Sequence, residues 1–257
     1  MSFLEGLFWT YAAVIGAAVG SFLNVCIVRL PEEESVVRPP SRCPGCTSEI
    51  AWYDNIPVLS WLWLRGRCRH CGEPISVQYP LVEAAAAAVW LGMAVLYGPT
   101  WRALEGAVLF SLLLGIAVVD ARHYLIPDAL SVGGLAAGLA LSLLPGGVGP
   151  LESAAAAAGG YAVLWAVAEA GEWWLDRPAM GGGDMKLMAM IGAFLGPLDS
   201  ILALFLGALT GTLVFGPVSL RTGKLVPFGV FLAVGAALAF LFGEPIADWY
   251  RAWALAG

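Results

Sequence analysis

The chain contains few charged residues and very few histidines. Asp, Glu, Lys and Arg make up 12% of its 257 residues, and it has 2 His. Soluble domains carry about 25% charged residues, so this chain lacks the polar surface of a water-soluble enzyme and the charge that keeps a disordered protein expanded. With 13 basic residues against 19 acidic ones, it has no broad basic face, so nucleic acid is not an expected partner.

Apolar sequence is abundant instead. Hydrophobic residues account for 60% of the chain, and its mean hydropathy is +0.80. A membrane-spanning helix needs about 20 mainly apolar residues. Suitable stretches lie near residues 6–28, 79–97, 103–120, 129–144, 153–170, 185–196, 198–219 and 226–242. The stretch 185–196 is short and ends before Pro197, so its full crossing stays open. The sequence therefore predicts an all-α polytopic membrane protein with about eight transmembrane helices.

Basic residues predict which side each loop faces, because they concentrate on the cytoplasmic side of membrane proteins. With eight spans and the N-terminus outside, 11 basic residues face inward, and only Arg102 and Arg251 face outward. If the stretch 185–196 does not cross, the count becomes 10 against 3, so charge does not decide this point. Both arrangements place the same three segments in the cytoplasm, residues 31–77, 121–128 and 171–184.

The one long hydrophilic segment, residues 31–77, carries two CxxC pairs. They are Cys43 with Cys46 and Cys68 with Cys71. Four thiolates on two such turns can bind Zn²⁺ tetrahedrally and leave no open position for a catalytic water. The gap between the pairs is slightly longer than the usual ribbon spacing. Two disulfides are the alternative, although a cytoplasmic loop is kept reduced. The pattern predicts a zinc-ribbon-like loop with a structural zinc ion.

Two acidic residues stand beside apolar runs, where a charge costs about 2.5–3.5 kcal/mol at the bilayer centre. Asp120 ends one predicted span, and Asp184 begins another after the glycines 181–183. The predicted topology places both at the same membrane face. Each Asp alone is explained by helix capping or an interfacial position. Together, facing carboxylates that share a proton can activate a water molecule and polarise a carbonyl group, which is the chemistry of aspartic proteases.

Two further acids have less specific contexts. Asp128 follows Pro127 at the start of a predicted span, which favours a helix-capping role. Glu83 lies near the start of another span, where burial in the bundle and contact with a ligand are both open. Paired intramembrane acids are also compatible with a cation-coupled transporter, and a non-catalytic scaffold is a third possibility.

Several motifs together resemble one known family. In chain order they are Gly20-Ser-Phe-Leu-Asn-Val-Cys-Ile-Val-Arg-Leu-Pro31, the four cysteines, Asp54-Asn-Ile-Pro57, Tyr79-Pro-Leu-Val-Glu83, Asp120 with Ile126-Pro-Asp128, Gly181-Gly-Gly-Asp184-Met-Lys-Leu187 with Ile191-Gly-Ala-Phe-Leu-Gly196, and Pro227-Phe-Gly-Val-Phe-Leu232. The chain resembles the bacterial prepilin peptidases, or type IV leader peptidases, which are membrane aspartic proteases of the Gly-x-Gly-Asp kind. It departs from the family pattern at Val230, where proline is often found.

The resemblance implies a catalytic pair, Asp120 and Asp184, supported by Gly181, Gly183, Lys186 and Asp128. The implied substrates are type IV prepilins or type II secretion pseudopilins, whose basic leader is cut after a glycine on the cytoplasmic side of the bacterial inner membrane. The functional division is then a first transmembrane helix over residues 1–30, a tetracysteine loop over 31–77 and a peptidase bundle over 78–257.

Many family members also methylate the new N-terminal amine with S-adenosylmethionine, and the long cysteine loop belongs to those members. Gly66 and Glu83 are the residues that the resemblance places in the methylation region. A peptidase without methyltransferase activity is the alternative at this point.

Overall fold

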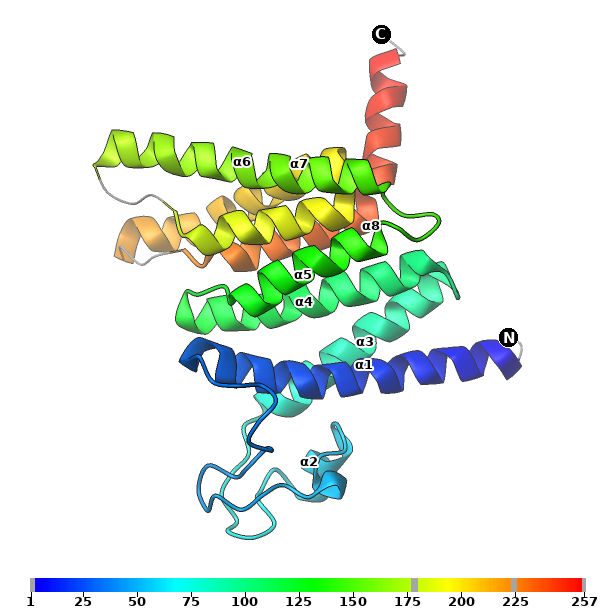
Figure 1. Cartoon of the computed structure of the whole chain (residues 1–257), viewed down its shortest axis with the longest axis vertical. Coiled ribbons are helices and arrows are strands. Elements are labelled where there is room, and N and C mark those ends of the chain that lie inside the picture. The colour runs from blue at the N-terminus through cyan, green and yellow to red at the C-terminus, as the bar shows by residue number, and fades with distance from the viewer. Residues whose placement is uncertain (1–2, 177–179, 223–225, 256–257) are drawn as a thin grey trace. The chain divides into compact units, whose positions relative to one another are not determined.

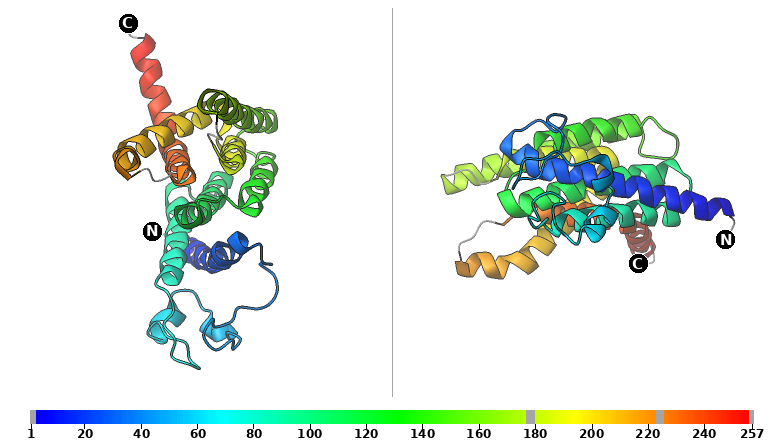
Figure 2. Two further views of the ribbon diagram at one scale, coloured as in Figure 1. Left: turned by 90° about the vertical axis from the view of Figure 1, so that its left-hand side faces the viewer. Right: turned by 90° about the horizontal axis from the view of Figure 1, so that it is seen from below.

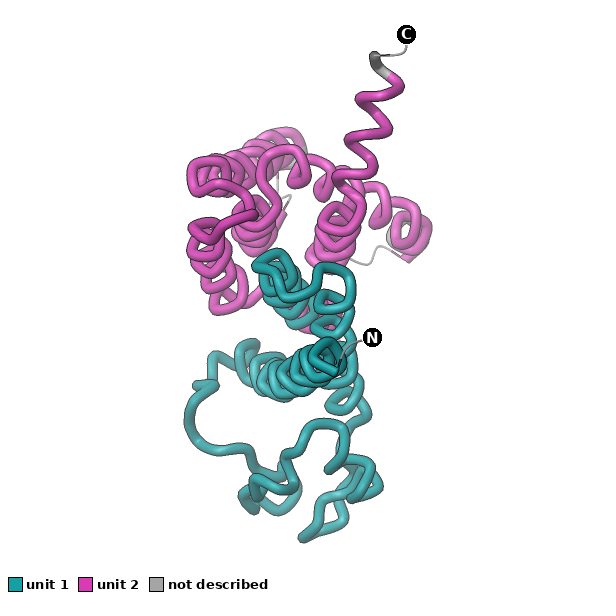
Figure 3. The backbone as a smooth tube through the Cα atoms, turned by 90° about the vertical axis from the view of Figure 1, so that its right-hand side faces the viewer, with its two compact units in different colours: residues 1–115 teal, residues 116–257 magenta. Residues whose placement is uncertain are grey.

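The computed structural model describes residues 3–176, 180–222 and 226–255. Over these residues the elements are helices, joined by turns and two isolated β-bridges. The predicted all-α membrane fold is confirmed. The chain divides into two compact units, residues 1–115 and residues 116–257 (Figure 3).

The first unit consists of one helix, a long loop and a second helix, followed by most of a third. Its elements are α1 (Phe3–Arg29), η1 (Leu30–Glu32), η2 (Trp52–Asp54), α2 (Leu59–Trp63), α3 (Gln78–Tyr97) and the larger part of α4 (Trp101–His123). Helix α1 packs against α3 (Figures 1 and 2).

Small residues allow α1 and α3 to approach closely. A Cβ atom at Gly16 would lie 2.7 Å from the carbonyl oxygen of Ala86, and one at Gly20 would lie 2.6 Å from the Cα atom of Glu83. In lipid, helices associate through packing of this kind because the bilayer supplies no hydrophobic drive between them. These contacts fix the start of α3 beside the end of α1, where the loop leaves the bundle.

The second unit is a helical bundle organised around a central helical segment that contains a break. Its elements are the end of α4, α5 (Asp128–Leu141), α6 (Pro150–Leu175), α7 (Gly182–Thr222) and α8 (Phe228–Leu255). Helix α7 packs against α5, α6 and α8 (Figure 1). Its first half supplies fully buried side chains, among them Leu187, Met190 and Phe194.

Helix α7 is interrupted where the sequence places a proline. Gly196 has φ 75° and ψ −178°, outside the helical region, and Pro197 follows it. The predicted stretches 185–196 and 198–219 are therefore two helical segments, separated at Gly196 as the sequence predicts, within the range of α7. Among the described residues, six helices are long and apolar enough to span a membrane, and α5 is a shorter apolar helix.

Two parts of the sequence-based description stay predictions. Arg177 and Lys224, both counted among the inward-facing basic residues, lie outside the described residues. The division into residues 1–30, 31–77 and 78–257 concerns activity, whereas the two compact units reflect packing, so this division stays a prediction.

Candidate active site and metal centre

The two CxxC pairs lie on turns with the same backbone hydrogen bonds. The amide of Cys43 donates to the carbonyl oxygen of Ser48 at 3.0 Å, and that of Cys68 donates to Glu73 at 2.8 Å. An isolated antiparallel bridge closes the base of each turn, Arg42 with Glu49 and Arg67 with Pro74. The fourth residue after the first cysteine has a positive φ in both turns, 58° at Thr47 and 75° at Gly72. The loop therefore contains two equivalent knuckles.

The knuckles bring the four cysteine sulfurs together. The Sγ atoms of Cys43, Cys46, Cys68 and Cys71 all lie within 4.8 Å of one another, and those of Cys43 and Cys71 are 3.7 Å apart. Tetrahedral zinc with Zn–S bonds of about 2.3 Å would separate its sulfurs by roughly 3.8 Å. A disulfide would need about 2.05 Å, and all four cysteines are free thiols. The predicted tetrad is thus a cluster that can hold a metal ion.

The chemistry of one of these sulfurs also suits a metal. Hydrogen bonds from Ser48 lower the pKa of the Cys46 thiol to about 6. This sulfur is therefore mostly a thiolate at neutral pH, which is the form that binds metal ions.

Gly66 lies just before the second knuckle, against the side chain of Trp61. It has φ 66°, and a Cβ atom there would lie 2.8 Å from the Trp61 ring. Its carbonyl oxygen accepts a hydrogen bond from the Ile75 amide at 2.7 Å, and the Trp61 indole nitrogen donates to the Ile75 carbonyl oxygen at 3.1 Å. A glycine is required here because both the backbone conformation and the Trp61 ring leave no room for a side chain.

An ion pair ties the segment between the knuckles to the second knuckle. Arg69 donates through Nε to Asp54 Oδ2 at 2.8 Å and through Nη2 to Oδ1 at 2.5 Å. The Arg69 guanidinium lowers the pKa of the Asp54 carboxyl below its usual value. This bidentate geometry is the preferred arrangement of arginine with a carboxylate.

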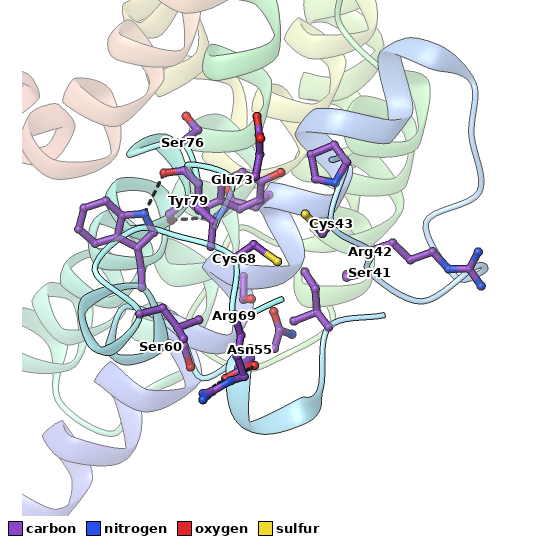
Figure 4. A pocket seen from close by; sticks show the side chains of 18 of the residues that line it. Ser41, Arg42, Cys43, Asn55, Ser60, Cys68, Arg69, Glu73, Ser76 and Tyr79 are labelled. Atoms are coloured by element: carbon purple, nitrogen blue, oxygen red, sulfur yellow. Dashed lines mark hydrogen bonds and ion pairs between the residues drawn. The ribbon is translucent and has the colours of Figure 1, made fainter. Parts of the chain in front are cut away.

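A cavity of about 430 Å³ lies between the knuckles, the end of α1 and the start of α3 (Figure 4). Glu83 lines it, is only 7% exposed, and accepts a hydrogen bond from the Val58 amide at 2.7 Å. Glu83 is therefore buried and also lines a space that can take a ligand, and its contact with a ligand stays a prediction. Gly66 does not line the cavity, but it contacts Trp61, which does.

In the second unit, Asp120 lies in the last turn of α4, and its carboxylate lies at the start of α8. It is 5% exposed. Its Oδ2 atom accepts a hydrogen bond from the Val230 amide at 3.1 Å, and the Gly229 amide also donates to the carboxylate. The N-terminus of a helix is the positive end of its dipole and stabilises a carboxylate. A Cβ atom at Gly229 would lie 2.8 Å from Asp120 Oδ2, so only glycine allows this approach.

Asp184 lies in the first turn of α7, in a reciprocal arrangement with Gly181. The Asp184 amide donates to the Gly181 carbonyl oxygen at 3.2 Å, and the Gly181 amide hydrogen-bonds the Asp184 carboxylate. The Asp184 side chain thus caps the start of α7 at the Gly181 amide, which is one half of a capping box, because Gly181 has no side chain to supply the other half. The carboxylate also lies close enough to Asp120 for the two groups to interact electrostatically.

Ile126 connects the starts of α7 and α8. A Cβ atom at Gly183 would lie 2.9 Å from Ile126 Cβ, and one at Gly229 would lie 2.9 Å from Ile126 Cδ1. The N-termini of α7 and α8 therefore approach the same buried side chain. Gly181 and Gly182 next to them are exposed. The structure thus brings Asp120 and Asp184 together at one place, although they are 64 positions apart in the sequence.

Asp128 makes an ion pair instead of capping its helix. Pro127 occupies the N-cap position of α5, and Lys186 Nζ lies 2.7 Å from both Asp128 oxygens. The predicted capping role is therefore replaced by a contact with the first turns of α7, which no local pattern reveals. The pair is substantially exposed, so its energetic value is small, but it fixes Lys186 two residues after Asp184.

Sequence reasoning did not select three residues of these sites. Arg69 lies inside the second CxxC pair, Asn24 is a polar residue within a predicted span, and Gly229 follows Pro227 at the start of the last helix. The intramembrane position of Asn24 was a usable signal, because a polar side chain there needs a partner. Gly229 gives no such signal, since its role depends on the remote Asp120.

Together, these features define a multi-pass helical membrane protein with a carboxylate pair in one unit and a four-cysteine cluster in the other. The family model described as Bacterial Peptidase A24 N-terminal domain matches residues 14–97, and that of the Type IV leader peptidase family matches residues 107–216. The chain belongs to the type IV leader peptidase family.

Proteins that are similar over most of their length carry the name prepilin leader peptidase/N-methyltransferase. One from Aeromonas hydrophila is 37% identical over 280 residues, covering 96% of this chain and 96% of its own. One from Burkholderia pseudomallei (strain 1026b) is 34% identical, covering 93% and 87%. One from Pectobacterium carotovorum subsp. carotovorum is 37% identical, covering 91% and 93%. No solved structure matches the chain.

Proposed function

We propose that this protein removes the leader of type IV prepilins with Asp120 and Asp184, and then methylates the new N-terminus. The observation that carries the peptidase half is a shared position: the Asp120 carboxylate accepts from the Val230 amide at the start of α8, Asp184 lies in the first turn of α7, and both helix starts approach Ile126. The names of the relatives support both halves. A buried carboxylate pair is the defining feature of aspartic-protease chemistry and needs no nucleophilic side chain.

The two carboxylates have different surroundings, which suggests a division of roles. Asp120 accepts hydrogen bonds from backbone amides of α8, and such donors stabilise a negative charge. Asp120 is the base that takes a proton from water as the water oxygen attacks the scissile carbonyl carbon. Asp184 carries the proton that polarises the carbonyl oxygen. Bond cleavage then requires a proton on the departing amine, which the carboxyl pair returns.

The surroundings of the pair suit an extended peptide. Gly181 and Gly182 are exposed and carry no side chains, so a substrate backbone can approach Asp184.

The substrates are type IV prepilins or type II secretion pseudopilins, cut after a glycine on the cytoplasmic side of the bacterial inner membrane. Gly183, Lys186 and Asp128 support the site by holding the first turn of α7. In this topology the N-terminus of the chain lies outside.

The cysteine cluster serves the second activity by fixing the loop. Cys43, Cys46, Cys68 and Cys71 would hold a zinc ion in a complete shell of four thiolates, so the ion would be structural and not catalytic. S-adenosylmethionine supplies the methyl group for the new N-terminal amine. Gly66 and Glu83 belong to the methylation region, since Glu83 lines the cavity and Gly66 positions its Trp61 wall.

The test is mass spectrometry of a purified prepilin after incubation with the protein and S-adenosylmethionine. The wild type removes the leader and adds one methyl group. The Asp120→Asn and Asp184→Asn variants leave the leader in place, while the matched control Asp176→Asn, an exposed Asp at the end of α6, cleaves normally. Leader removal by either active-site variant would refute the peptidase assignment. Cleavage without methylation by the wild type would leave a peptidase alone.

A further inference from the structure

Helix α8 is longer than the core of a membrane requires. Its 28 residues would measure about 42 Å as a straight helix, whereas the hydrocarbon core of a bilayer is about 30 Å thick. The start of α8 is held against the Asp120 carboxylate through the Val230 amide. The surplus length therefore lies at the opposite end of the helix, in residues 244–255.

A glycine and a proline mark the place where α8 changes direction. Pro245 lies inside the helix, and a proline bends a helix because it has no backbone N–H and its ring crowds the carbonyl group four residues earlier. A Cβ atom at the buried Gly243 would lie 2.7 Å from the Asp199 Cγ atom, so a glycine lets this side chain of α7 pack beside the bend. The last part of α8, red in Figures 1 and 2, accordingly leaves the direction of the rest of the helix.

The segment beyond the bend has one apolar face. Ile246, Trp249, Tyr250 and Trp253 have the i, i+3, i+4 and i+7 spacing that places side chains on one side of a helix. The three aromatic side chains are 68%, 58% and 66% exposed in chain order, and the rings of the last two lie 6.2 Å apart. Phe242, also exposed, continues this face into the last turn before the bend. Aromatic surface of this extent favours an apolar environment over water.

Charged residues occupy the other side of the same segment. Glu244, Asp248 and Arg251 are exposed and have the i, i+4 and i+7 spacing. Arg251 Nη2 donates to Asp248 Oδ1 at 2.7 Å. With two acidic residues and one basic residue, this face has no excess positive charge to attract anionic headgroups. A helix with aromatic residues on one face and charges on the other is typical of helices that lie in the membrane interface.

We propose that residues 244–255 form an interfacial helix that binds phospholipid, with its aromatic face toward the bilayer and its charged face toward water. The occupant of the aromatic face is lipid because the segment continues directly from α8, which is long and apolar enough to span a membrane. The segment therefore begins where hydrocarbon meets headgroups. Tryptophan and tyrosine concentrate at this boundary, since each joins an apolar ring to a polar N–H or O–H group. The helix thereby anchors the end of α8 that lies opposite the carboxylate pair.

The experiment uses photo-crosslinking of the full-length protein in phosphatidylcholine vesicles. The photoreactive amino acid p-benzoylphenylalanine replaces Trp249 or Trp253 on the aromatic face. Matched controls carry it in place of Asp248 or Arg251, in the same turns of the helix but on the charged face. Intact-protein mass spectrometry measures the fraction of chains that gain the mass of one lipid after illumination, and circular dichroism checks that each variant is folded.

The aromatic-face positions should form lipid adducts several times more often than the controls, and added anionic phosphatidylglycerol should leave this ratio unchanged. Every other outcome overturns the proposal. Equal adducts at all four positions would show lipid on every side of the segment, as around a spanning helix. Crosslinked dimers from the aromatic face would assign it to a second copy of the chain. Adducts only with phosphatidylglycerol would show attraction by charge, and no adducts would place the face in water.

Quenching of tryptophan fluorescence measures the depth of the segment by a second route. The signal of the wild type minus that of the double variant Trp249→Phe, Trp253→Phe isolates these two side chains. Lipids brominated near the headgroup end of their acyl chains should quench this difference more than lipids brominated near the methyl end, because an interfacial helix reaches only about 5–10 Å into the boundary. Stronger quenching by the deeper bromines, or no quenching by either lipid, would contradict the interfacial position.

Discussion

The two units place their reactive groups in opposite ways. In the first unit, four cysteines on two short knuckles come together because each knuckle is a local turn with its own hydrogen bonds. In the second unit, Asp120 and Asp184 meet only because α4, α7 and α8 bring their ends to one place. A site built on local turns depends on metal and loop sequence, whereas a site built on helix ends depends on the whole bundle. The two sites should therefore fail independently.

The largest expected effect comes from Asp184→Asn. Loss of an acid–base group costs about 10²–10⁴-fold in rate, so leader cleavage should fall below detection in a standard assay. The metal content and the binding of S-adenosylmethionine should stay at wild-type values, because these belong to the other unit. Reduced metal content in this variant would show that the two units are coupled and would contradict the independent failure of their sites.

Cys46→Ser tests the converse. Replacing one of four thiolates should release the metal, and elemental analysis should fall from about one metal ion per chain to a trace. Methylation should be lost because the knuckles wall the cavity, while leader cleavage continues. Cys26→Ser is the control, since Cys26 is buried within α1 and lies outside the cluster. Full metal content in Cys46→Ser would contradict the four-thiolate site.

Gly229→Ala should have an intermediate effect on cleavage alone. The added Cβ atom would lie 2.8 Å from Asp120 Oδ2 and must displace the carboxylate. A displacement of about 1 Å from the reacting geometry costs on the order of 10²-fold in rate. The pH profile of the residual activity should also shift, because the amide donors of α8 no longer hold the charge. Gly159→Ala is the control, since a Cβ atom there meets nothing within 4 Å. Equal activity in both variants would remove Gly229 from the site.

The smallest expected effect concerns the ion pair between Asp54 and Arg69. Because Arg69 lowers the pKa of Asp54, the pair stabilises the fold fully above the unfolded pKa of about 3.9. This contribution is lost as the pH falls through the lower, folded pKa. Asp54→Asn should therefore lower the Tm slightly at pH 7, and the difference from the wild type should vanish in acid. A constant difference at all pH values would show that packing, and not charge, holds this segment.

The sequence predicted the local site better than the remote one. CxxC spacing indicates a four-thiolate cluster because each pair shares one turn, and the motif order around Asp120 and Asp184 indicates a membrane protease. Local patterns failed where the partner is distant. Asp128 suggested a helix cap, but its partner Lys186 lies 58 positions away. Gly229 was passed over because its role depends on the remote Asp120, which no spacing near residue 229 encodes.

The apolar stretches were predicted well as separate segments. The predicted spans are helical, and Pro197 correctly marked the boundary between two of them, which the structure places at Gly196. Hydropathy detects the apolar segments and the proline. Whether the chain turns back or continues after the break depends on how each half packs against α5, α6 and α8, which is a property of the assembled bundle.

The loop contains the same kind of knuckle twice. The two turns have the same kind of closing bridge, amide-to-carbonyl bond and left-handed residue after the second cysteine, so they are equivalent structural units whose cysteines meet in one cluster. The other residues of each knuckle can be substituted while its two cysteines keep their positions. Residues on the outer sides of the knuckles can therefore be substituted without changing the cysteine cluster between them.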